Sequence, residues 1–315
     1  ALGANDVISN SSALSVNGGT FALGSYSDTV GAVTIGANGG SITSTTGVLT
    51  GSSYTFNNTS AATVSAILAG SVNLTQAGSG TTTLSGANTY SGSNTLNGGT
   101  LALSGNGTLG STANNLTMSA TAALDLQRAL TVGNLVMATG NTITNSTGSS
   151  SLTVGGTSSL GGSITTSGNQ TYAGATTIAA NTSLTSTANG TITFSSTVNS
   201  ASAATYSLTT STGTGSTVFA STVGASYALA SLNTSGDTSI GGSVTTAGVQ
   251  GYGGTVTVGA ISSLITNNAN INFNSNVVLN ASLTLNAGSA DVNILGNVSL
   301  GNGGGPASQA SYEAA

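Results

Sequence analysis

The most constraining feature of this sequence is a pair of motifs that return at one fixed interval. The segment 17–23 (NGGTFAL) returns as 97–103 (NGGTLAL), and the segment 161–168 (GGSITTSG) returns as 241–248 (GGSVTTAG), so both pairs are offset by the same amount. Repeats at a long fixed period are typical of solenoids and stacked arrays. The shared interval predicts one stacked repeat through the chain, with roughly 20 residues per coil if the interval holds four coils.

Short strands are predicted throughout. Apolar–polar–apolar units recur every 8–12 residues or so and are bounded by Gly, Asn or Ser, which favour turns. Proline occurs once, at Pro306, so almost nothing forbids continuous hydrogen-bonded ladders. Residues 120–130 (ATAALDLQRAL) have some helical character but also alternate, and we interpret them as strand. The units that carry the prediction are 14–16, 20–23, 33–35, 54–56, 72–74, 101–103, 192–194, 256–258, 271–273, 283–285 and 292–294.

The strand spacing alone also fits an antiparallel sandwich, but the long fixed interval favours a parallel arrangement, because stacked coils copy local motifs. We therefore predict an all-β protein: a right-handed parallel β-helix (β-solenoid) of about 15 coils of about 20 residues. Inward Leu, Ile, Val, Phe and Ala should form apolar ladders, and turn Asn and Thr should hydrogen-bond along the axis. The predicted organisation is a single solenoid over 1–300 and a Gly-rich flexible or inter-subunit tail over 301–315.

Charge is nearly absent, and this restricts the partners. The 315 residues include one Arg, no Lys and no His, and the net charge is −5. One arginine cannot form a phosphate-binding face, so neither nucleic acid nor an anionic membrane surface is an expected partner. No apolar run approaches the roughly 20 residues of a membrane helix, so we expect no membrane insertion of this segment. The chain begins at Ala1 within repeat-like sequence, which suggests a mature or excised piece.

The residues needed for most catalysis are missing. Without His, Cys or Lys, the chain lacks the usual general bases, nucleophile partners and metal ligands. A paired-carboxylate glycosidase needs two acids within roughly 5–10 Å, whereas these acids are spread along the chain. We expect no enzyme, no catalytic residues, no metal site and no cofactor. The charged residues are Asp6, Asp28, Asp125, Arg128, Asp237, Asp291 and Glu313.

Three smaller features allow functional hypotheses. Asp125 and Arg128 are the local ion-pair candidates, with an exposed pair contributing under about 1 kcal/mol, and Asp237 is interpreted as a turn residue. The tyrosines are interpreted as covering the coil exterior or capping the core, with stacking on sugars as the alternative. Thr-x-Thr units (142/144, 185/187, 191/193 and 255/257) raise an ice-binding hypothesis, but they do not share one phase of the period.

Residues 74–103 (LTQAGSGTTTLSGANTYSGSNTLNGGTLAL) closely resemble the passenger-associated transport repeat of bacterial autotransporters, also called the autotransporter-associated β-strand repeat. The resemblance rests on 84–92 (LSGANTYSG) and 96–101 (LNGGTL). The family usually has a Lys near Gln76, and this chain departs there. Residues 161–260 are similar to the Thr/Gly-rich repeats of filamentous-haemagglutinin-type exoproteins.

These resemblances divide the predicted solenoid into transport-repeat-like coils over 1–150 and tandem exoprotein-like coils over 151–300. They imply a secreted, right-handed β-helical passenger, extracellular or on the outer surface of a Gram-negative cell.

Together these features predict a non-enzymatic extracellular structural protein: a secreted β-solenoid that forms a surface stalk, adhesin or self-assembling fibre. Neither residues 1–10 nor 301–315 resemble the polar cap that a solenoid end needs, so self-association, end-to-end or lateral, is expected. A carbohydrate or matrix ligand is a second candidate partner. The alternative is an autotransporter passenger spacer that presents a host- or matrix-binding adhesin tip.

Overall fold

The computed structural model describes residues 1–201, 206–301 and 310–312. All regular elements in these residues are β-strands, which confirms the all-β prediction. Residues 120–130 contain strand and no helix, as interpreted from the sequence. No helix in the described part could cross a membrane. The chain divides into two compact units, Ala1–Ser151 and Leu152–Ala315, which are described separately. Most of the predicted 301–315 tail lies outside the described residues.

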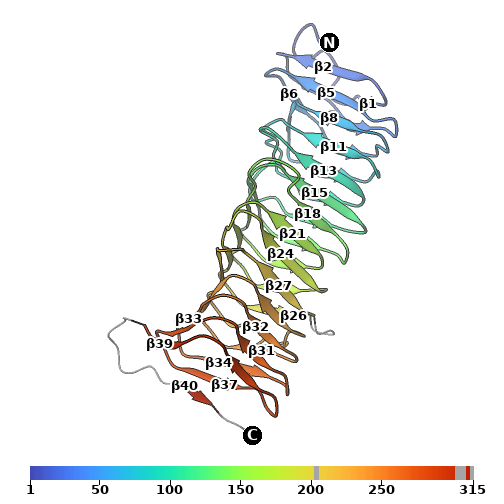
Figure 1. Ribbon diagram of the computed structural model, residues 1–315. Coiled ribbons are helices and arrows are strands. Elements are labelled where there is room, and N and C mark those ends of the chain that lie inside the picture. The colour runs from blue at the N-terminus through green and yellow to red at the C-terminus, as the bar shows by residue number, and fades with distance from the viewer. Residues whose placement is uncertain (202–205, 302–309, 313–315) are drawn as a thin grey trace. The chain divides into compact units, whose positions relative to one another are not determined.

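Two long sheets and one short sheet form the first unit, and the first two stack their strands in chain order (Figure 1). The first sheet holds β1 (Leu14–Val16), β4 (Ala32–Ile35), β7 (Ser53–Phe56), β10 (Leu74–Gln76), β12 (Asn94–Leu96), β14 (Leu116–Met118) and β17 (Leu135–Met137). The second holds β2 (Thr20–Gly24), β5 (Gly40–Ser44), β8 (Ala62–Val64), β11 (Thr81–Leu84), β13 (Gly99–Leu103), β15 (Ala122–Leu126) and β18 (Thr142–Thr144). The third side has β3 (Asp28–Thr29), β6 (Val48–Thr50) and β9 (Ile67–Ala69), and later β16 (Leu130–Val132).

Three sheets also form the second unit. The first has β20 (Ser158–Leu160), β23 (Thr176–Ile178), β26 (Val198–Ser200) and, after an interruption, β31 (Val244–Thr246), β34 (Ser262–Thr266), β37 (Leu283–Asn286) and β40 (Ala310–Tyr312). The second has β21 (Ser163–Thr166), β24 (Thr182–Ser186), β27 (Leu208–Ser211), β29 (Leu232–Thr234), β32 (Gln250–Tyr252), β35 (Ile271–Phe273) and β38 (Val292–Ile294). The third has β19 (Leu152–Val154), β22 (Gln170–Tyr172), β25 (Ile192–Phe194), β28 (Ser216–Phe219), β30 (Asp237–Ile240), β33 (Val256–Val258), β36 (Val277–Leu279) and β39 (Val298–Leu300).

Parallel pairing between successive turns confirms the predicted β-solenoid. Leu14 pairs with Val33, whereas Thr182 pairs with the more distant Leu208, so turns differ in length. The chain makes about 13 turns rather than about 15, because many turns are longer than the predicted coil. Most predicted strand units are confirmed. Residues 72–74 are an exception, since β10 begins only at Leu74.

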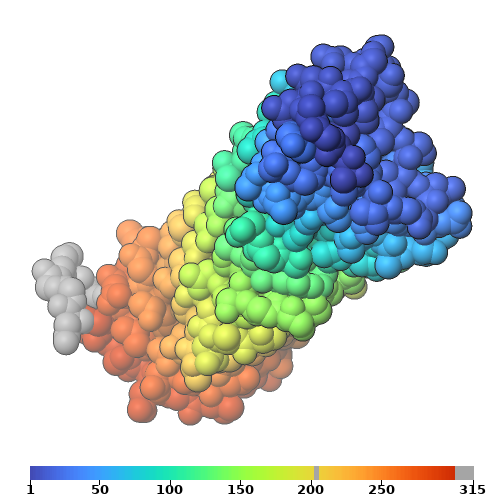
Figure 2. Space-filling model, turned by 90° about the horizontal axis from the view of Figure 1, so that it is seen from above, coloured from blue at the N-terminus to red at the C-terminus, as the bar shows by residue number. Residues whose placement is uncertain are grey.

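The core consists of columns of inward side chains, in which each turn contributes one residue to each column. Three-residue strands commonly bury their first and third side chains and turn the middle one outward, as period 2 requires. One ladder of the second unit runs through Tyr172, Phe194, Phe219, Ile240 and Val258, all buried. Buried side chains of successive turns therefore fill the interior of the coil. On the outside, segments that follow one another in the chain adjoin within each unit (Figure 2).

Asparagine at the corners joins each turn to the next, as predicted, and Asp237 does so as well. The side-chain oxygen of Asn73 accepts the N–H of Ser93 (2.8 Å), and that of Asn169 accepts the N–H of Thr191 (2.9 Å). Further bonds of this kind are accepted by Asn17, Asn115, Asn181, Asn189, Asn268, Asn270, Asn276 and Asp237. Corner Asn therefore supplies an axial ladder outside the sheets, because its amide mimics a backbone acceptor.

The N-terminal residues lie along part of the first turn, although residues 1–10 do not resemble a polar cap in sequence. Leu2 donates its N–H to the carbonyl of Ala22 (2.9 Å), and Asp6 donates to that of Ser27 (3.1 Å). The buried carboxylate of Asp28 accepts the N–H groups of Val7 and Ile8. This segment thus supplies backbone partners to part of the first turn.

The copied motifs have different structural meanings in the two units. In the first unit, residues 20–23 and 99–103 lie on the same sheet, four turns apart, in β2 and β13. The ladder of Phe21 nevertheless reaches Leu103 rather than its sequence counterpart Leu101, because the four intervening turns are unequal in length. The shift is by two positions and therefore keeps the same face.

In the second unit the copies occupy different sheets, so the prediction of four stacked coils is wrong there. Ile164 lies in the second sheet, in the ladder of Leu184, Thr210 and Thr234. Its counterpart Val244 pairs instead in the ladder of Val198 and Val223, on the first sheet. Starting from β21, which holds Ile164, three full turns lead to β29 on the same sheet. The chain then passes through β30 on the third sheet to β31 on the first sheet, so the interval between the copies spans three and two-thirds turns.

Candidate functional site

The transport-repeat segment, residues 74–103, crosses β10, β11, β12 and β13 of the first unit. Between β11 and β12 the described chain has no strand on the third side, where residues 85–93 pass. This stretch contains the Ser-Gly-Ala-Asn-Thr-Tyr-Ser-Gly part of the resemblance. Backbone bonds such as those from Thr89 to Leu68 and from Ser91 to Gly70, together with side chains of this stretch, supply contacts that a third strand would otherwise make.

Asn88 replaces a rung of the missing strand. Its side-chain oxygen accepts the N–H of Leu68 in the preceding turn (2.9 Å), and its amide nitrogen donates to the carbonyl of Thr108 in the following turn (2.8 Å). The side chain is 5% exposed. Asn88 thus bonds one turn before and one turn after itself, as a strand backbone does.

We expect Asn88→Ala to lower the free energy of unfolding by about 2–4 kcal/mol, because it leaves a buried N–H and a carbonyl without partners. Urea unfolding followed by far-UV circular dichroism measures the change. Asn73→Ala is the control, since Asn73 is an exposed corner residue with a similar turn-to-turn bond. Equal losses in both variants would contradict the assigned role.

Gly86 and Gly92 are required by close backbone approach. A Cβ at Gly86 would lie 2.3 Å from the carbonyl oxygen of Ala66, and one at Gly92 would lie 2.2 Å from that of Val72. Both contacts join the loop to the preceding turn. The glycines of the LSGANTYSG motif therefore allow tight stacking, rather than forming a ligand-binding loop.

Tyr90 anchors the same loop in the core. It is fully buried, and its hydroxyl donates to Asn94 Oδ1 (2.5 Å), while its ring lies 5.9 Å from that of Tyr54. The Tyr54 hydroxyl accepts the N–H of Gly51 (2.9 Å) and lies 2.7 Å from the carbonyl of Leu49. These groups satisfy one another inside the coil, so they serve packing.

The two Gln-x-Tyr copies form the same buried Gln–Tyr hydrogen bond on different sheets; we call this arrangement the Gln–Tyr lock. The hydroxyl of Tyr172 donates to Gln170 Oε1 (2.9 Å), and Tyr252 donates to Gln250 Oε1 at the same distance. Each tyrosine ring also stacks on a phenylalanine of the next turn, at 5.1 and 5.2 Å. Of the two interpretations of the tyrosines, as covering the coil exterior or as capping the core, the first is wrong for Tyr54, Tyr90, Tyr172 and Tyr252, all buried. The alternation along each strand could have indicated this burial, because Tyr54, Tyr172 and Tyr252 stand at inward positions.

The buried tyrosines make the stability of the fold decrease at alkaline pH. Burial raises the pKa of Tyr54 to about 12, and it also raises the pKa of Tyr90, Tyr172 and Tyr252 above the ordinary value. Because the folded state holds these protons more tightly, the stabilisation is fully present below about pH 10, the unfolded pKa, and is lost as pH rises through the folded pKa.

We expect the urea midpoint to be steady towards pH 10 and to fall between about pH 10 and 12. Tyrosinate absorbance measured beside circular dichroism checks the cause. The account requires that the four buried tyrosines ionise together with unfolding. Ionisation of all eight near pH 10 while the strands persist would contradict it.

Asp125 and Arg128 do not pair with each other in the described part of the chain. Asp125 accepts the N–H of Ser146 (2.9 Å) and the side-chain N–H of Gln127 (2.9 Å), whereas Arg128 donates to the carbonyl of Gly105 (3.0 Å). Burial alone would raise the pKa of Asp125, but the hydrogen bonds from Ser146 and Gln127 lower it below its ordinary value. The carboxylate thus acts as a turn-to-turn acceptor.

Asp6 and Asp28 lie on neighbouring segments, because the Asp6 N–H donates to the carbonyl of Ser27 and the Asp28 carboxylate accepts the N–H of Val7. Asp237 and Asp291 belong to the second unit and are far apart in sequence. Asp237 begins β30 and accepts the N–H of Thr255 (2.8 Å), so it joins two turns at a corner. Asp28 is buried near the N-terminal segment, and Asp291 is exposed before β38. Among the described residues, no three metal-binding side chains of the His, Cys, Asp or Glu type come together.

Threonine forms an outward ladder that the Thr-x-Thr pattern does not identify. Thr34, Thr55, Thr75, Thr95 and Thr117 follow one another on the first sheet of the first unit. The singled-out units lie elsewhere: Thr193 and Thr257 share a ladder, but Val218 and Ser239 separate them. A single column of hydroxyls is narrower than a two-column array, and ice binding stays a hypothesis.

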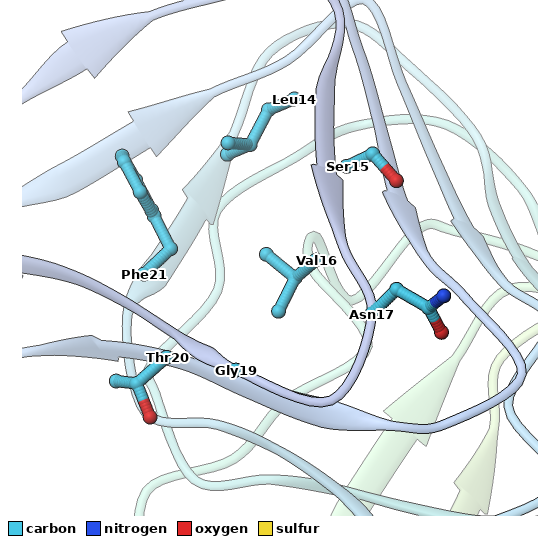
Figure 3. Close-up of a pocket in the computed structure, with 7 residues that line it drawn as sticks. All are labelled: Leu14, Ser15, Val16, Asn17, Gly19, Thr20 and Phe21. Atoms are coloured by element: carbon cyan, nitrogen blue, oxygen red, sulfur yellow. The ribbon is translucent and has the colours of Figure 1, made fainter.

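A cavity of about 310 Å³ opens beside the first turn of the first unit. Figure 3 shows Leu14, Val16 and Phe21 pointing toward one another, with Ser15 and Asn17 directed away. No charged residue lines it. The cavity is the edge of the apolar core, because its lining continues the inward ladders of β1 and β2.

The comparisons with known proteins agree with the resemblance. Residues 74–103 match the family model of the passenger-associated-transport-repeat. No curated protein and no solved structure matches the chain. The repeat and the β-solenoid fit an autotransporter passenger, and this family suggests a secreted or surface location and a non-enzymatic role. The similarity of residues 161–260 to filamentous-haemagglutinin-type repeats stays a prediction.

Proposed function

We propose that the chain is a non-enzymatic extracellular structural protein, a secreted β-solenoid that serves as a surface stalk, adhesin or self-assembling fibre. The observation that carries the proposal is the use of the polar residues. Corner Asn and Asp, buried Gln and buried Tyr mostly bond to neighbouring turns or to one another. The polar side chains therefore serve mainly to join neighbouring turns, and such bonds stiffen a solenoid.

The surface suits assembly at a cell exterior. Six charged residues occur in the described part, five of them acidic, so neighbouring copies would repel one another little. The exposed Leu295, Val298 and Leu300 near the C-terminal end are 76%, 49% and 58% exposed, and such apolar groups favour association. Self-association, lateral or end-to-end, is part of this proposal.

The alternative is a passenger spacer that presents an adhesin tip formed by another segment. The transport-repeat match supports both versions, because each needs a secreted solenoid. The versions differ in where binding and assembly occur. A spacer needs neither self-association nor a ligand of its own.

Electron microscopy of the purified chain over a hundredfold concentration range tests the proposal. We expect single particles at low concentration and fibres or lateral bundles at high concentration. Particles that stay single throughout would contradict self-assembly and leave the spacer. Turnover of polysaccharide substrates by the purified chain would contradict the structural role itself.

A further inference from the structure

The first sheet of the second unit is interrupted by an outward bulge. After β26, three isolated bridges continue the sheet: Val223 pairs with Val198 and with Val244, and Leu229 pairs with Thr246. Only Thr245 separates Val244 from Thr246, whereas the segment 224–228 separates Val223 from Leu229. The additional residues, 225–228, therefore leave the sheet and project outward, since the bridging residues on either side are buried.

The bulge is held in one conformation by the preceding turn. The side-chain oxygen of Asn199 accepts the N–H groups of Ser226 (2.9 Å) and Tyr227 (3.4 Å), and the N–H of Ser200 donates to the carbonyl of Tyr227 (3.0 Å). Gly224 has a φ of +72°, and a Cβ there would lie 2.1 Å from the carbonyl oxygen of Thr245. The chain thus leaves the sheet at a position that only glycine fits.

This bulge presents an aromatic side chain to solvent. Tyr227 is 49% exposed, whereas Tyr172 and Tyr252 in the same unit are fully buried with bonded hydroxyls. Beyond the bulge on the same sheet lie Thr245 and then Ile265, which is 37% exposed. A β-bulge commonly redirects a side chain at a functional site, and insertions in solenoid repeats often form the binding face.

The surroundings select a neutral ligand. The charged residues described in this unit are Asp237, at the start of the third sheet, and Asp291, before the second-sheet strand β38, and neither lies on the bulged sheet. Tyr supplies a rigid amphipathic surface, and Ser and Asn supply adaptable hydrogen bonds, a combination typical of recognition loops. One tyrosine and one isoleucine are too small for the roughly 800 Å² per partner of a stable protein interface.

From the bulge geometry we infer that residues 224–229, with Tyr227 at the centre, form a binding surface for a neutral oligosaccharide. The tyrosine ring stacks on the apolar face of a sugar ring, and nearby hydroxyl groups bond to the sugar hydroxyls. This inference rests on the proposed function and gives its adhesin version a ligand class. It concerns the purified chain alone, so its failure would leave the structural role standing.

A glycan array of neutral, sialylated and sulfated oligosaccharides, probed with the full chain, tests the inference. Titration with the best neutral oligosaccharide follows, by saturation-transfer NMR. We expect binding to neutral oligosaccharides that changes less than twofold between about 0.1 and 1 M salt. Tyr227→Ala should weaken it at least tenfold, and Tyr227→Phe should retain most of it, because stacking needs only the ring.

Tyr26→Ala is the matched control, since Tyr26 is a second exposed tyrosine (37%) outside the bulge, and it should bind as the unmodified chain does. Unchanged circular dichroism spectra would show that each variant folds. The inference is overturned by no binding at millimolar oligosaccharide, by equal effects of Tyr227→Ala and Tyr26→Ala, or by binding to sulfated glycans alone. Retention of a protein partner that Tyr227→Ala abolishes, without glycan binding, would likewise overturn it.

Discussion

Phe194→Ala is expected to lower the free energy of unfolding by about 4 kcal/mol or more. Phe194 is fully buried between two aromatic neighbours, with ring centroids 5.1 Å from Tyr172 and 5.3 Å from Phe219. Truncating a buried phenylalanine costs about 3–5 kcal/mol, and each lost aromatic pair adds about 0.5–1.5 kcal/mol. The closely packed turns on both sides limit collapse into the cavity.

Urea unfolding of the full chain, with amide hydrogen exchange of β22, β25 and β28, measures this loss. Thr193→Ala is the control because Thr193 is the outward neighbour on the same strand, and it should cost less than about 1 kcal/mol. Exchange protection should fall most in the three strands that meet at Phe194, since solenoid turns contact only their neighbours. A loss in Phe194→Ala no greater than in Thr193→Ala would contradict the aromatic ladder.

Deleting residues 162–241 is expected to leave a folded, shorter solenoid. The deletion joins Gly161 to Gly242, so the second copy of the motif follows β20 in place of the first. Val244 then occupies the position of Ile164, and the Gln250–Tyr252 lock occupies that of Gln170–Tyr172, which has the same internal bonds. The remaining strands move to the next sheet, where the alternation of buried and outward residues is the same.

Deleting residues 162–246 is the matched control and should abolish cooperative unfolding of the second unit. It also removes the segment 242–246 and joins Gly161 to the turn after β31, so a turn falls where β21 should lie. Thermal unfolding and hydrogen exchange compare the two deletions. If both are equally unstable, the two motif copies are not interchangeable between sheets.

The sequence predicted that the chain winds into stacked parallel turns, but it did not predict which sheet each strand occupies. Short units such as Ile192–Phe194 and Val256–Val258 alternate so regularly that the inward residues follow from period 2. The copied motifs suggested equal coils, yet the turn that pairs residue 182 with residue 208 is much longer than the turn that pairs residue 232 with residue 250. Corner length is set by local turns and leaves no periodic signal, so the sheet that a copy occupies could not be predicted.

The features with functional interest were harder to predict. Asn88 was part of the recognised motif, but its bonds to two neighbouring turns depend on a missing strand that only the fold reveals. Tyr227 and Tyr252 both follow a glycine within a few residues, yet one is half exposed and the other is buried. Their difference comes from the additional residues of the bulge, which displace Tyr227 from the inward ladder.

The distance between spin labels at Thr193→Cys and Val218→Cys tests the winding most directly, and the absence of native cysteine makes the labelling specific. These outward residues are ladder partners on adjacent turns, so their Cα atoms should be about 5 Å apart and their spectra strongly broadened. Equal coils of about 20 residues would instead place residue 213 beside Thr193. Sharp, uncoupled spectra for the Thr193–Val218 pair would contradict the parallel ladder on which the fold rests.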